Sequence, residues 1–166
     1  MMTAAIPQGA PTDIGAAFAH INSVTAPTVD DLKIMVLVEA AGLELYGKLA
    51  AGTDNAAVAA LLQHNGREEM AHAHRVAKAI TALCGEDYPP PPASENPYLA
   101  TKIPETPLTV DKLRGLALGE VAGDTLYGTW AANIGNEEAA RLFRLNGKEE
   151  LDHAARLHEA AELLEA

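Results

Sequence analysis

The chain has 166 residues, of which 48% are hydrophobic but only 4% are aromatic, and its formal net charge is −11. This length suits one domain with a sizeable core, and the abundance of Ala, Leu and Glu favours helix over sheet. The negative charge repels phosphates, so neither nucleic acid nor a membrane is an expected partner. Cys84 is the only cysteine, which excludes an internal disulfide, a thiolate zinc cage and an iron–sulfur centre and indicates a reducing, cytoplasmic location.

Residues 1–27 are small and interrupted by prolines. They lack the basic start and continuous apolar run of a signal peptide, and no apolar stretch of the chain is long enough to span a membrane. We expect an N-terminal extension that is partly mobile and contains a short helix at about Asp13–Asn22.

The rest of the chain is a sequence unit that occurs twice. Residues 28–85 and 109–166 align without gaps at a shift of 81 positions, and 25 of the 58 aligned pairs are identical. In the first unit, Thr28 and Asp31 form a predicted capping box, and the helix that follows runs to about Gly52. A second helix begins at Asp54 or Asn55 and ends at about Cys84, with Gly85 as its predicted C-cap. Each unit is therefore predicted to be a helical hairpin.

The second unit predicts helices from Val110 to Ile134 and from Glu137 to near the end, joined by Gly135-Asn136. Residues 86–108 contain a run of four prolines and three further prolines, so they cannot be a continuous helix. We expect them to cross from one end of the molecule to the other. The predicted fold is all-α: an up-down four-helix bundle over residues 28–166.

Each predicted helix has an inward stripe that is apolar at its ends and polar in the middle. The polar positions are Glu39, Glu69 with His72, Glu120, and Glu150 with His153. Buried carboxylates that face one another repel and normally require compensation. Two divalent ions would balance the four negative charges, and the histidines would add neutral donors. The spacing Glu-x-x-His on two helices, with one Glu from each of two others, predicts a site for two metal ions. Iron is the expected metal, and manganese or zinc are the alternatives.

These residues resemble the ferritin-like superfamily, and most closely its rubrerythrin and bacterioferritin branch. The resemblance covers both repeat units and rests on Glu39 with Glu69-Met70-Ala71-His72 and on Glu120 with Glu150-Leu151-Asp152-His153. It implies a di-iron centre that reacts with dioxygen or peroxide. The chain departs from this pattern in three respects. It lacks the cysteine pairs of a rubredoxin domain, and it lacks a fifth cage-forming helix. Gly123 stands where rubrerythrins have an extra glutamate.

Several neighbouring residues are candidates for supporting roles. Tyr46 and Tyr127 are predicted to approach the metals as hydrogen-bond or electron donors, or else to be core aromatics. Asn65 and Asn146 are predicted to orient ligands, and Asp124 to bind a metal, orient a histidine or accept protons. Glu68 and Glu149 are also candidates for orienting a ligand, although the sequence favours exposed positions for them. Three duplicated glycine pairs predict close helix approach or open space near the metals: Gly42/Gly123, Gly47/Gly128 and Gly66/Gly147.

The leading functional hypothesis is a di-iron carboxylate oxidoreductase of the peroxidase or ferroxidase type. Its expected partners are peroxide or dioxygen and an external electron donor. A di-iron hydroxylase or a manganese catalase is an alternative with the same ligands. A non-enzymatic iron store is a further alternative, and a homodimer or larger homo-oligomer is compatible with the sequence.

Overall fold

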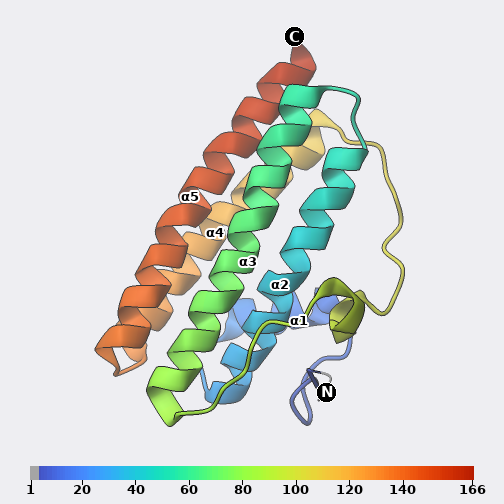
Figure 1. The fold of residues 1–166 in the computed structure, drawn as a ribbon. Helices are drawn as coiled ribbons and strands as arrows, with labels where there is room; N and C mark the ends of the chain where they lie inside the picture. Colours follow the sequence, from blue (N-terminus) through green and yellow to red (C-terminus); the bar gives the residue numbers. More distant parts are fainter. Residues whose placement is uncertain (1–3) are drawn as a thin grey trace.

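The computed structural model describes residues 4–166 and is all-helical over that range, without strands. Its α-helices are α1 (Ile14–Ser23), α2 (Val29–Ala51), α3 (Ala56–Cys84), α4 (Val110–Asn133) and α5 (Glu137–Glu165). Two 3-10 turns, η1 (Ala93–Glu95) and η2 (Pro97–Leu99), lie between α3 and α4. The four long helices lie side by side, and the short α1 lies at the end where α2 begins (Figure 1). This arrangement is compatible with the predicted four-helix bundle, with α1 as an additional helix.

The helix ends follow the predicted caps. The Thr28 hydroxyl accepts from the Asp31 amide, and the Asp31 carboxylate accepts from the Thr28 amide, which completes the capping box at the start of α2. Asn55 caps α3, and Gly85, with a φ of 75°, ends it in the left-handed region. α1 lies within one residue of the short helix that the sequence predicted, while residues 1–3 of the predicted mobile extension lie outside the described range.

The long helices pack as two hairpins, α2 with α3 and α4 with α5, and the hairpins join where α3 packs against α5. α2 and α4 do not pack closely against each other. The segment between α3 and α4 crosses from one end of the molecule to the other, as predicted (Figure 1). The buried Asn96 side chain attaches it to α2 by donating to the Leu37 carbonyl.

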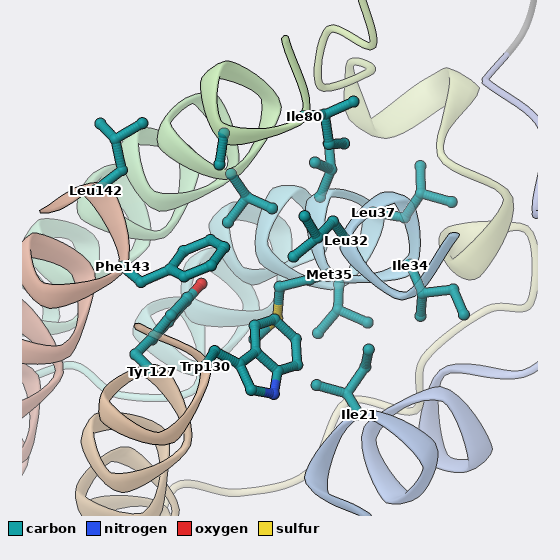
Figure 2. Packing of buried hydrophobic residues seen from close by; sticks show 14 of the residues in the cluster. Ile21, Leu32, Ile34, Met35, Leu37, Ile80, Tyr127, Trp130, Leu142 and Phe143 are labelled. Carbon is teal, nitrogen blue, oxygen red and sulfur yellow. The ribbon is translucent and has the colours of Figure 1, made fainter. Parts of the chain in front are cut away.

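The apolar core is divided into two clusters along the helix axes. One cluster contains Trp130, Phe143 and Tyr127 together with residues of α1 and α2, and Figure 2 shows Trp130 beside Met35, with Tyr127 and Phe143 on one side of it and Ile21 on the other. The other cluster occupies the opposite end of the long helices. A polar layer lies between the two clusters, at the middle of the helices. Within residues 4–166, no helix is long and apolar enough to cross a membrane.

Candidate metal centre

The polar layer brings together all six residues that the sequence predicted as metal ligands: Glu39 of α2, Glu69 and His72 of α3, Glu120 of α4, and Glu150 and His153 of α5. Both imidazoles are fully buried, and the two rings stack with their centroids 5.1 Å apart. One ligand atom from each of Glu69, His72, Glu150 and His153 lies within 4.8 Å of the others. This group could hold a metal ion.

Three carboxylates face the Nδ1 atom of His72. Glu150 Oε1 lies at 3.4 Å, Glu69 Oε2 at 3.5 Å and Glu39 Oε2 at 3.8 Å. Two of these three carboxylates come from helices other than α3. The imidazole nitrogen is therefore surrounded by negative oxygens from three helices.

The Nδ1 atom of His153 has an equivalent environment. Glu69 Oε1 and Glu150 Oε2 each lie at 3.4 Å, and Glu120 Oε2 lies at 3.8 Å. Glu69 and Glu150 thus face both imidazoles, whereas Glu39 and Glu120 each face one. The surroundings of the two imidazoles are therefore equivalent, with corresponding residues of the two sequence units in corresponding positions.

Two glycines make room for the shared carboxylates. A Cβ atom on Gly42 would lie 2.8 Å from Cβ and Cγ of Glu69, and one on Gly123 would lie 3.2 Å from Cδ of Glu150. Any side chain at these positions would push against a central glutamate. The predicted close approach is therefore observed at this pair, while Gly47 and Gly128 have open space around them.

The opposite nitrogen of each imidazole is hydrogen-bonded to a carboxylate on the other hairpin. Nε2 of His72 lies 3.0 Å from Glu149, whose carboxylate also accepts two hydrogen bonds from Arg75 at 2.6 and 2.9 Å. Hydrogen bonds from His72 and Arg75 lower the pKa of Glu149 to about 2. Because an ionised carboxylate only accepts, it keeps a proton on Nε2 and leaves Nδ1 as the nitrogen that faces the centre, where a bound cation would replace any proton on Nδ1.

His153 is held in the same way. Its Nε2 lies 3.0 Å from Glu68, which also accepts from Arg156 at 2.6 Å. The favoured exposed position for Glu68 and Glu149 is therefore wrong: both are half-buried, because each reaches across α3 and α5 to a histidine. Sequence reasoning also missed both arginines, although Arg75 and Arg156 are an identical pair in the repeat.

Asn65 and Asn146 complete these outer contacts. Asn65 is fully buried, donates to the His153 carbonyl and accepts from Arg156. Asn146 makes the equivalent contacts with the His72 carbonyl and Arg75. The asparagines thus position the backbone of the histidine-bearing turns, in agreement with their predicted orienting role.

The tyrosines cross between the hairpins. The Tyr127 hydroxyl donates to Glu39, and the Tyr46 hydroxyl donates to Glu120. Burial, followed by the charge of the neighbouring glutamates, raises the pKa of both phenols, which keeps them protonated as donors. Each tyrosine therefore reaches the centre through the glutamate of the other hairpin.

The electrostatics of the layer fit bound cations. His72 Nδ1, His153 Nδ1 and Glu150 Oε2 are buried and have no hydrogen-bond partner among residues 4–166. Burial, together with the charge of Glu69, raises the pKa of Glu39 to about 7. Burial alone would lower the pKa of His153, but contacts with Glu120, Glu150 and Glu69 raise it to about 12. The layer therefore stabilises positive charge, and its mixture of imidazole and carboxylate donors suits iron, manganese or zinc.

Two neighbouring positions differ from the pattern of the stripes. Asp124 is half-buried beside Gly147 and is not part of the four-residue group that could hold a metal. Leu43 lies four residues after Glu39, where the helix period predicts an inward position, but it is 40% exposed. The inward face of α2 is instead formed at this level by Glu39, Gly42 and Tyr46, and the backbone of Leu43 lies beside Gly66 of α3.

A cavity of about 370 Å³ leads from α2 and α4 to the carboxylate side of the layer. Its inner end is formed by Glu39, Glu69, Glu120 and Glu150 with both tyrosines. Neither histidine lines it. The carboxylates are therefore reachable from the gap between α2 and α4, while the imidazoles lie behind them.

Comparison of the chain with family models, curated proteins and solved structures finds no match.

Proposed function

We propose that this chain is a ferritin-like four-helix bundle that binds two iron ions and acts as a di-iron oxidoreductase of the rubrerythrin type in the cytoplasm. One observation carries the proposal. Two buried imidazole nitrogens have no hydrogen-bond partner, and each faces three carboxylates. Four glutamates carry four negative charges, which two divalent ions balance.

The contacts support a division of the ligands between two ions. Glu39 and His72 would hold one ion, and Glu120 and His153 would hold the other. Glu69 and Glu150, which face both imidazoles, would be shared. Bound ferrous iron supplies electrons for the reduction of peroxide or dioxygen, and an external reductant restores them.

Tyr46 and Tyr127 are the proposed catalytic residues of the chain. Each holds a phenolic proton at the inner end of the cavity and donates it to a ligand glutamate. We expect Tyr127→Phe and Tyr46→Phe to retain iron and to slow its oxidation by peroxide. Stopped-flow absorbance of the iron-loaded variants, compared with their iron content, would measure this; oxidation at the wild-type rate in both variants would assign the rings a packing role.

The test of the main proposal uses the full chain loaded with ferrous iron. Addition of peroxide should consume about one peroxide per iron pair and produce the near-ultraviolet absorption of ferric iron. Glu69→Ala should bind less iron and lose this reaction, because Glu69 faces both imidazoles. A wild-type protein that binds iron but leaves both peroxide and dioxygen unconsumed would contradict the proposal.

The apolar cavity favours hydroxylation of an organic substrate as a second candidate function. Most of its lining residues are glycines or carry apolar side chains, and the lining includes the four proposed ligand glutamates. Small-molecule sites commonly combine apolar walls with a few convergent polar groups. Oxygen consumption that requires an apolar organic compound and converts it to an alcohol would favour this function over a peroxidase.

A further inference from the structure

The side chains that line the cavity between α2 and α4 indicate the kind of ligand that the cavity could bind. Its walls come from α1, α2 and α4 and include the aliphatic or aromatic residues Phe18, Ile21, Met35, Val38, Leu45, Leu49, Leu116 and Leu126. Outside the carboxylates and tyrosines at the inner end, Asn22 is the only polar side chain in the lining. No lysine, arginine, histidine or aspartate of the described residues lines it.

We propose that this cavity binds an uncharged, largely aliphatic organic molecule, which reaches the carboxylate layer from the gap between α2 and α4. An anionic ligand would bury its charge between walls on which no lysine, arginine or histidine of the described residues could balance it. A cationic ligand would compete with the metal ions for the same carboxylates. An uncharged apolar ligand gains from removal of its surface from water and requires no counter-charge.

Two further observations support an occupant that enters the cavity. α2 and α4 do not pack closely, although each packs fully against its hairpin partner. Gly115 and Gly119 line the cavity on successive turns of α4, and a Cβ atom on either would meet nothing within 4 Å.

The volume limits the size of the ligand. An apolar cavity of about 150 Å³ accommodates benzene, so a cavity of about 370 Å³ accommodates roughly twelve to fifteen carbon atoms. The inner end would place one terminus of such a molecule at the proposed metal ligands. An uncharged aliphatic ligand would be the substrate class of the proposed oxidoreductase, and to that extent the inference rests on the proposed function. Binding of the ligand itself requires no redox reaction.

The test is a fluorescence titration of the full chain with the uncharged fluorophore 1-aminoanthracene, followed by displacement with 1-decanol. We expect saturable binding at one site, displacement by 1-decanol, and displacement by decanoate that is at least about tenfold weaker. Absence of saturable binding, or equal displacement by decanoate, would overturn the proposal. The titration is run without metal and with Zn²⁺, so failure of iron redox chemistry is a separate result.

A matched pair of variants locates the binding site. Gly115→Leu adds a side chain at the opening and should weaken fluorophore binding about tenfold or more. Gly128→Leu is the control, because Gly128 lies on the same helix with nothing within 4 Å of an added Cβ but does not line the cavity. Circular dichroism of both variants would verify folding. Equal binding by Gly115→Leu and Gly128→Leu would place the fluorophore elsewhere and overturn the proposal.

Self-association is measured in the same samples by sedimentation. A monomer, or an oligomer that binds one fluorophore per chain, supports the proposal. If the chain dimerises and fluorophore binding disappears as the dimer forms, a second copy covers the gap between α2 and α4, and the proposal is wrong.

Discussion

Each central imidazole is fixed from behind by an ionised carboxylate of the opposite hairpin, and an arginine on the imidazole's own helix holds that carboxylate. The hydrogen bond from Nε2 sets both the tautomer and the direction of the ring. Glu149 is held by Arg75 as well as by His72. These outer residues therefore determine whether Nδ1 has the orientation and the tautomer that binding of a cation requires.

We expect Glu149→Gln to weaken metal binding about 10- to 100-fold, because the amide keeps the size of the side chain but removes its charge. Competition with a chromogenic chelator for Zn²⁺ would measure the change. Glu68→Gln should have a similar effect, since Glu68 makes the equivalent contact with His153. Glu137→Gln is the control, because the Glu137 side chain is 93% exposed; an equal loss in this variant would indicate a general effect of surface charge.

At the scale of a helix, α2 combines a crowded glycine with an open one. Gly42→Ala places a Cβ atom 2.8 Å from Glu69, whereas Gly47→Ala meets nothing within 4 Å. We expect Gly42→Ala to lower the free energy of unfolding by about 1–3 kcal/mol and Gly47→Ala to raise it by up to about 1 kcal/mol. Urea denaturation of the metal-free proteins would measure both, and a Gly42→Ala variant more stable than wild type would contradict the crowding.

The capping box of α2 predicts a pH-dependent contribution to stability. Burial would raise the pKa of Asp31, but hydrogen bonds from Thr28 and His20 outweigh it, and the pKa is lowered. A lowered pKa means that the ionised carboxylate stabilises the fold above the pKa of the unfolded chain, and that this stabilisation is lost as pH falls through the folded pKa.

Asp31→Asn should therefore destabilise the protein by about 1 kcal/mol near pH 7, and the difference from wild type should shrink as pH falls from about 5 to about 3. Thermal unfolding across this pH range would measure it. Asp30→Asn controls for the helix dipole, because Asp30 lies in the same turn with its side chain 67% exposed. A difference between Asp31→Asn and wild type that is independent of pH would contradict the role of the charge.

For the whole molecule, metal binding should stabilise the fold because the ligands come from four helices. At a free metal concentration of about 100 times the Kd, the gain is about 2.7 kcal/mol, and we expect a rise in Tm of roughly 5–10 °C. Differential scanning fluorimetry with Zn²⁺ or Mn²⁺ would measure it. His153→Ala should lose this rise, and the exposed His158 supplies the control variant His158→Ala. An unchanged wild-type Tm would argue against a metal centre.

The helices and six central donors could be predicted because their signals are local. The helix period places Glu69 and His72 on one face, and Thr28, Asn55 and Gly85 mark helix ends. Periodicity does not determine which residue of another helix lies opposite. The contacts of Arg75 with Glu149 could therefore not be predicted from the spacing on either helix alone. The separation of α2 from α4 depends on how the two hairpins pack and was likewise not predicted.

The contacts that cross between the two hairpins would couple the stability of one hairpin to that of the other. His72 on α3 depends on Glu149 of α5, and Tyr46 on α2 depends on Glu120 of α4. Neither hairpin alone contains a full coordination set, so each ion would act as a cross-link between segments that no turn connects directly. Chelation should therefore speed amide hydrogen exchange most along the contact of α3 with α5, and least at the turn that joins α2 to α3.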